Sequence, residues 1–119
     1  MAAIKRVGVI GAGQMGGGIA HVCALAGYEV LINDIAPERI ADSLKVIDHN
    51  MSRQVARGVV GEIDKLEAFA RIRPAESLAD LSEVDLAIEA ATEDEETKKS
   101  IFRALRPHLS PTAMLASNT

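Results

Sequence analysis

Short apolar segments alternate with segments of helical periodicity along the chain. The apolar run Ile4–Ile10 predicts a strand, and the small residues Gly11–Gly13 after it predict a tight turn. A helix is predicted over Gln14–Leu25 and should end at Gly27, because glycine readily adopts the backbone conformation that closes a helix. A second strand is predicted over Glu29–Asn33. The N-terminal part of the chain therefore has a strand–helix–strand pattern.

The next segment has the periodicity of a long amphipathic helix. Between Glu38 and Arg57 apolar side chains recur three or four residues apart, which keeps one face of a helix buried. Pro37 suits the first turn of this helix, because a proline lacks the N–H that would go unpaired there. After it we predict a short helix at 62–70, a short strand around Ile72 and a loop at 77–81. A strand at 84–90, a helix at 92–105 and a short strand at 113–116 follow. This alternation predicts an α/β fold in one domain, residues 1–119.

Glycines stand at the junction of the first strand and the first helix with the spacing GxGxxG. Gly11 permits a tight turn, Gly13 lacks a Cβ that would hold a pyrophosphate off the backbone, and Gly16 lets the helix lie close to the sheet. The full turn consists of Gly11, Ala12, Gly13, Gln14, Met15 and Gly16. It could serve only as a tight connection, but the strand before it and the helix after it favour dinucleotide binding. This predicts a Rossmann-type, doubly wound parallel sheet in three layers.

An aspartate, Asp34, ends the second predicted strand. A carboxylate there accepts hydrogen bonds from the hydroxyls of the adenosine ribose, which favours NAD as the cofactor. It would repel the 2′-phosphate of NADP, and Ile35 and Ala36 carry no positive charge to offset that repulsion. Arg39 is near enough in sequence to weaken this argument. Alternatively, Asp34 is simply a solvated loop acid or an N-cap acid before Pro37.

The strand 84–90 should end beside the glycine turn, because ligands of open α/β sheets bind where the strand order reverses. Ala90 and Ala91, at the end of this strand, are notable for their small side chains. The acidic run 93–96 has a simpler interpretation, since acidic residues stabilise the start of a helix through its macrodipole. Lys98 follows one turn later and is expected to form a solvated ion pair with one of these acids.

Composition narrows the class of protein. With 48% hydrophobic and 25% charged residues the chain is typical of a globular domain. A net charge of −4 argues against nucleic-acid binding, which needs a basic surface. A single cysteine, Cys23, favours a reducing compartment, and neither a signal peptide nor a membrane span is evident, so we expect a cytoplasmic protein. No metal site and no catalytic base are predicted, because no Cys/His cluster has zinc spacing and the histidines lie in or near predicted helices.

Three segments carry a family pattern. They are residues 7–35, with the glycine turn and Asp34, residues 86–102, LAIEAATEDEETKKSIF, and residues 116–119, ASNT. Together they resemble the N-terminal domain of the 3-hydroxyacyl-CoA dehydrogenases over essentially the whole chain. The resemblance implies an NAD-binding domain of an oxidoreductase that converts 3-hydroxyacyl-CoA to 3-oxoacyl-CoA in fatty acid metabolism, by β-oxidation.

The resemblance also assigns roles to residues. Besides the glycine turn and Asp34, the residues it implies to contact NAD are Ala91, Glu93, Lys98 and Asn118, the last of them near the nicotinamide and the substrate. It places Ser43 against the CoA part of the substrate. The family's basic residue about two turns later is not matched, because Asn50 stands there and Arg53 is the nearest substitute.

Parts of the family pattern would lie beyond Thr119. They are the catalytic histidine, the glutamate that orients it and a helical C-terminal domain used for dimerisation. We therefore expect a truncated chain that is inactive alone, and a homodimer for the full-length protein. A stand-alone NAD-binding or redox-sensing module is the alternative. A dehydrogenase of another hydroxy acid or of a sugar acid is disfavoured by residues 86–102 and 116–119.

Overall fold

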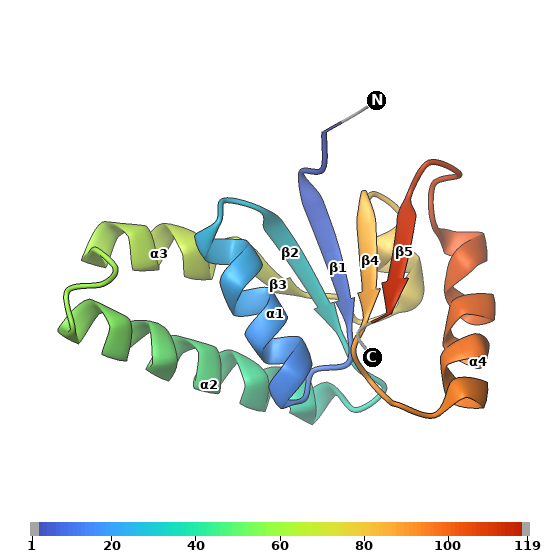
Figure 1. The fold of residues 1–119 in the computed structure, drawn as a ribbon, viewed down its shortest axis with the longest axis horizontal. Helices are drawn as coiled ribbons and strands as arrows, with labels where there is room; N and C mark the ends of the chain where they lie inside the picture. Colours follow the sequence, from blue (N-terminus) through green and yellow to red (C-terminus); the bar gives the residue numbers. More distant parts are fainter. Residues whose placement is uncertain (1–2, 118–119) are drawn as a thin grey trace.

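The structure, a computed structural model, describes residues 3–117 and is built around one parallel sheet of five strands (Figure 1). The strands are β1 (Arg6–Ile10), β2 (Glu29–Asn33), β3 (Ile72–Pro74), β4 (Leu86–Glu89) and β5 (Met114–Ser117), in the spatial order β3-β2-β1-β4-β5. The helices are α1 (Gln14–Leu25), α2 (Pro37–Ala56), α3 (Glu62–Ala70) and α4 (Glu95–Leu105), with 3₁₀ turns η1 (Leu78–Leu81) and η2 (Arg106–His108). The strand order reverses at β1, which confirms the predicted doubly wound fold.

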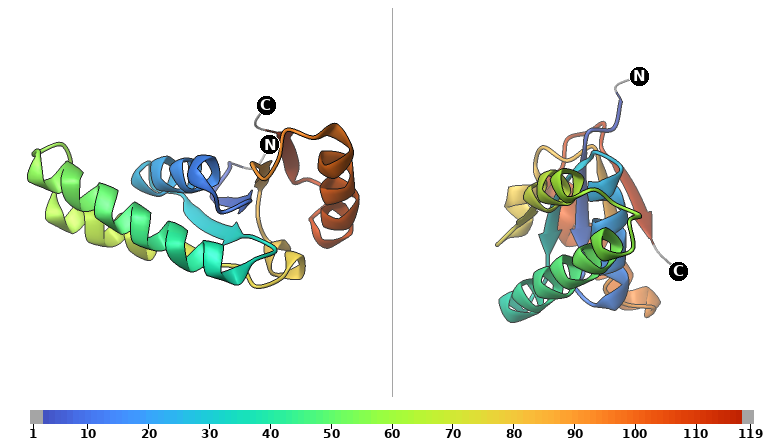
Figure 2. Two further views of the ribbon diagram at one scale, coloured as in Figure 1. Left: turned by 90° about the horizontal axis from the view of Figure 1, so that it is seen from below. Right: turned by 90° about the vertical axis from the view of Figure 1, so that its left-hand side faces the viewer.

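Helices cover both faces of the sheet (Figure 2). On one face Val9 and Ile32 pack with side chains of α1, α2 and α3, among them the fully buried Ile47. On the other face Leu81 of η1 and Leu105 of α4 close a second core over β1 and β4. Each core removes apolar side chains from water, which is the main favourable term in folding. The three predicted layers are therefore present.

The pair formed by α2 and α3 projects beyond the β3 edge of the sheet (Figures 1 and 2). Ile40, Ile47 and Met51 are buried on one face of α2, as their spacing predicts. The Lys65 ammonium lies 2.7 Å from the Asp48 carboxylate and joins the two helices on their polar side. The long helix thus has one side free to line a cleft beside α1.

The start of the sheet is fastened by a carboxylate. One oxygen of Asp85, just before β4, accepts the backbone N–H of Lys5 at 2.8 Å and of Arg6 at 3.0 Å. These hydrogen bonds favour the charged form and hold the pKa of Asp85 below its ordinary value. The beginnings of β1 and β4 are thereby joined at the end of the sheet opposite the glycine turn.

The fourth helix begins later than the sequence pattern predicts. It starts at Glu95 instead of Thr92, because Asp94 is the N-cap and its carboxylate accepts the backbone N–H of Thr97 at 2.9 Å. The Thr92 hydroxyl in turn accepts the backbone N–H of Asp94 at 3.0 Å. Threonine and aspartate both favour the N-cap position, and here Asp94 occupies it instead of Thr92.

Other boundaries differ by a few residues from the predicted ones. The first strand begins at Arg6, the predicted strand 84–90 is shortened to β4, and β5 begins and ends one residue later than predicted. The predicted loop 77–81 contains η1, which a reciprocal capping box between Ser77 and Asp80 stabilises. Within residues 3–117, no helix has both the length and the apolar character that crossing a bilayer requires.

Candidate dinucleotide-binding site

The glycine turn has almost no room for side chains where it meets its neighbours. Gly11 has a φ of 109°, and a Cβ on it would lie 2.7 Å from backbone atoms of Ala91. A Cβ on Gly16 would collide with the carbonyl oxygen of Gly11. By contrast, a Cβ on Gly13 would meet no atom within 4 Å. Gly11 and Gly16 are thus required by packing, and Gly13 leaves an open approach to the backbone.

The helix that follows the turn presents a positive end without a local neutralising group. Its N-cap is Gly13, which offers no side chain to accept from the first-turn amides, and the first turn holds no acidic residue. Gln14 and Met15 are exposed. A helix start with this composition favours an anionic ligand through the macrodipole and the backbone N–H groups. The residues present therefore fit the pyrophosphate of a dinucleotide.

Asp34 joins the end of β2 to the glycine turn. One carboxylate oxygen accepts the backbone N–H of Ala12 at 2.8 Å, and the other accepts that of Ala36 at 2.9 Å. Its side chain is only 6% exposed, so the alternative of a solvated loop acid is wrong, and the N-cap of the following helix is Ala36 instead of Asp34. A carboxylate has about four acceptor positions, and two remain for ribose hydroxyls. The Arg39 guanidinium approaches within 3.7 Å.

Glu89 lies at the end of β4, as Asp34 does at the end of β2. The sequence pattern did not single it out. It is fully buried, and one carboxylate oxygen accepts the backbone N–H groups of Ala91 at 2.7 Å and Thr92 at 3.0 Å. The other oxygen accepts the Ser117 hydroxyl at 3.1 Å. This carboxylate therefore shapes the loop that packs against Gly11.

The start of α4 carries two residues that the family resemblance assigns to NAD. Glu93 is exposed in the loop before the helix. Lys98 is only 5% exposed, and among residues 3–117 it forms no ion pair, so the expected solvated pair is wrong. Asp94, the N-cap between them, has its pKa lowered by hydrogen bonds from the Thr97 side chain and backbone. Asn118 lies outside the described residues.

A cleft of about 610 Å³ separates α1 from α2. It begins at the glycine turn, and Arg39, Ser43 and Asn50 line it from α2. Ser43 is buried, and its Oγ lies 2.6 Å from where a Cβ on Gly17 would stand, so the two helices approach closely there. The structure thus places Ser43 in the cleft beside the turn. It does not place Glu93 or Lys98 there.

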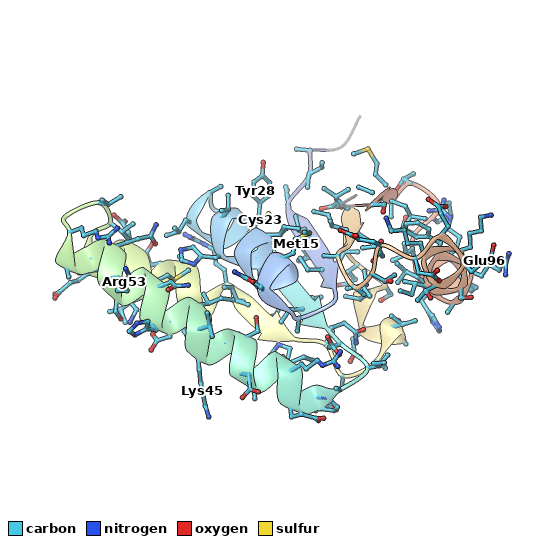
Figure 3. All side chains as sticks on the ribbon, turned by 60° about the horizontal axis from the view of Figure 1, so that its bottom comes forward. Met15, Cys23, Tyr28, Lys45, Arg53 and Glu96 are labelled. Atoms are coloured by element: carbon cyan, nitrogen blue, oxygen red, sulfur yellow. The ribbon has the colours of Figure 1, made fainter. Side chains whose placement is uncertain are left out.

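A second hollow adjoins the cleft along the C-terminal half of α2, since His21 and Asn50 line both. His21 Nε2 lies 2.7 Å from Gln54 Oε1, which links α1 to α2. The second hollow, of about 220 Å³, lies next to this bond and is lined by Arg53 and Arg57. Figure 3 shows Arg53 on α2 and Lys45 pointing away from α1. The hollow could therefore receive anionic groups at the far end of the cleft.

Comparison with known proteins agrees with this geometry. The family described as "3-hydroxyacyl-CoA dehydrogenase, NAD binding domain" matches residues 6–119. This chain belongs to that family. The family is described as NAD-binding, which confirms the predicted cofactor.

Several relatives are similar over nearly the whole chain. A 3-hydroxybutyryl-CoA dehydrogenase of Bradyrhizobium diazoefficiens is 52% identical over 99% of this chain and 40% of its own length. The crystal structure of Mycobacterium tuberculosis FadB2 has a TM-score of 0.95 at 44% identity, over 99% of this chain and 42% of that one. A fatty acid oxidation complex subunit alpha of Acinetobacter baumannii is 34% identical over 98% of this chain and 16% of its own. The chain therefore spans less than half the length of these relatives.

Proposed function

We propose that this chain is the NAD-binding part of an oxidoreductase that oxidises 3-hydroxyacyl-CoA to 3-oxoacyl-CoA. The observation that carries the proposal is the assembly of the glycine turn with the two strand ends beside it. Asp34 and Glu89 each hold a loop in place around Gly11 through backbone N–H groups. The names of the relatives supply the substrate class.

In this proposal the residues of the chain bind and orient the cofactor. The open backbone at Gly13 and the start of α1 receive the pyrophosphate, and Asp34 accepts from the adenosine ribose. The family resemblance assigns Ala91, Glu93, Lys98 and Asn118 to NAD as well, and it places Asn118 near the nicotinamide. Bound NAD would supply the acceptor for the hydride that leaves the carbon carrying the 3-hydroxyl.

The hydroxyl proton needs a general base, and we place this base outside the chain. His21 forms a hydrogen bond with Gln54 that links α1 to α2. His49 and His108 are exposed and lie far along the sequence from the glycine turn. The family resemblance assigns the base to a histidine after Thr119. On this basis the isolated chain should bind NAD and turn over no substrate.

The cleft between α1 and α2 is where we place the CoA part of the substrate. Ser43 and Asn50 line its middle, and Arg53 and Arg57 lie at its far end. Two arginines there can neutralise CoA phosphates. This supports Arg53 as the substitute for the family's basic residue, whose position Asn50 occupies in this chain. We further propose a role in fatty acid metabolism in the cytoplasm and a homodimer for the full-length protein.

The test is a calorimetric titration of the chain with NAD, in wild type and in two glycine variants. Gly13→Ala should fold normally, since the new methyl meets no atom within 4 Å, yet it would stand where the pyrophosphate approaches. We expect the Kd for NAD to rise at least about tenfold. Gly18→Ala is the matched control, because its methyl also meets no atom within 4 Å.

Equal NAD affinity in all three proteins would contradict the proposed site. Titration with acetoacetyl-CoA then separates the substrate class from the alternative of a redox-sensing module. Binding that weakens in Arg53→Ala supports the acyl-CoA cleft. NAD binding without any binding of acetoacetyl-CoA would support a stand-alone NAD module.

A further inference from the structure

Arg39 stands at a position that the stability of α2 does not explain. It lies in the first turn of α2, where the positive end of the helix dipole disfavours a cation. Its side chain is 64% exposed, and its guanidinium is 3.7 Å from Asp34. With the guanidinium largely exposed and 3.7 Å between the charged groups, the pair contributes little to stability. Arg39 also lines the cleft beside the glycine turn, so it is accessible to a ligand bound there.

Asp34 alone repels a 2′-phosphate on the adenosine ribose only weakly. Its two oxygens already accept backbone N–H groups of Ala12 and Ala36, and these partners offset part of its negative charge. Arg39 adds a full positive charge on the exposed side of the same carboxylate. A guanidinium in this position is free to turn from the carboxylate to a phosphate and to bind it through two N–H groups.

We propose that Arg39 is a specificity-determining residue that lets this chain bind NADP as well as NAD, by donating hydrogen bonds to the 2′-phosphate of the adenosine ribose. The inference rests on the proposed function, which places that ribose beside Asp34. Neutral residues at the two positions directly after Asp34 leave Arg39 as the nearest cation in this segment. The preference between NAD and NADP therefore depends on how far attraction of the 2′-phosphate by Arg39 offsets its repulsion by Asp34.

The experiment titrates wild type, Arg39→Ala and Lys45→Ala with NAD and with NADP at low and at physiological salt. Arg39→Ala should weaken NADP binding about fivefold or more and change NAD binding less than twofold. Lys45 is the matched control: it lies on the same helix, is exposed and points away from α1 (Figure 3), so its loss removes one charge without touching the site. Salt should weaken NADP binding in wild type more than in Arg39→Ala.

Titration with adenosine bisphosphates identifies the phosphate to which Arg39 binds. The 2′,5′-bisphosphate mimics NADP, and the 3′,5′-bisphosphate mimics the nucleotide end of CoA. A loss in Arg39→Ala that is confined to the 2′,5′-compound supports the inference, and a loss confined to the 3′,5′-compound overturns it. Equal losses of NAD and NADP would also overturn it while leaving the proposed function intact. If the folded wild type bound no NAD, both proposals would fall.

Discussion

Replacing Glu89 by leucine tests whether one buried carboxylate holds the second half of the site together. Leucine keeps a similar volume but removes the acceptor of the Ala91 and Thr92 N–H groups and of the Ser117 hydroxyl. A buried donor left without a partner costs about 1–3 kcal/mol. Water can reach this partly exposed loop, so we take about 1.5 kcal/mol for each backbone N–H and expect a total loss of about 3 kcal/mol.

The matched variant is Glu89→Gln. A glutamine oxygen in the place of the carboxylate oxygen that faces the loop still accepts both backbone N–H groups. The glutamine NH₂ then faces Ser117, whose hydroxyl can turn to accept from it. Only the charge is lost, so we expect a cost of about 1 kcal/mol or less. Ser117→Ala leaves one oxygen of the buried carboxylate without its donor, so it should cost about 1.5 kcal/mol.

Urea unfolding followed by circular dichroism gives these free energies, provided that the slope with urea is the same for each variant. In a domain of 119 residues, 3 kcal/mol corresponds to a fall in Tm of about 12 °C. Glu89→Leu within 1 kcal/mol of wild type would refute the assigned role. So would equal losses in Glu89→Leu and Glu89→Gln, because the argument requires that accepting hydrogen bonds matters more than charge.

Three further outcomes follow from single contacts. Gly16→Ala should lower the Tm by at least about 10 °C, because its methyl collides with the Gly11 carbonyl, whereas Gly18→Ala should leave the Tm unchanged or raise it; equal Tm values in both would contradict this packing. The pKa of Asp85 is lowered by folding, so its stabilisation is complete above the ordinary value of 3.8 and is lost as pH falls through the lowered one. Urea midpoints of wild type and Asp85→Asn should therefore converge in acid, and a constant difference would exclude this linkage. The unpaired edge of β5, with Met114 51% exposed, should make the chain self-associate in sedimentation, less so in Met114→Lys; a monomer at all concentrations would count against it.

Sequence patterns predicted those features of the fold and site that depend on neighbours along the chain. The glycine turn and Asp34 were predicted because tight turns and strand ends require particular residues in a fixed order. Glu89 was not singled out, because an acid inside an apolar strand is recognised as a site only when its partners from β5 and the following loop are known. Lys98 was predicted to be solvated for the same reason, since its burial depends on tertiary packing.

The two carboxylates also explain how an acidic protein presents a site for an anionic cofactor. Asp34 and Glu89 stand at the ends of the strands that flank β1, and each accepts two backbone N–H groups from the loop after its own strand or from the glycine turn. Backbone N–H groups thereby offset part of their negative charge, while the first turn of α1 has no acid of its own. The start of α1 thus stays favourable for anions, because the nearby acids serve as hydrogen-bond acceptors for the backbone. In the proposed site Arg39 adds a positive charge beside Asp34, where the adenosine ribose is placed, which is why its substitution should change cofactor choice more than stability.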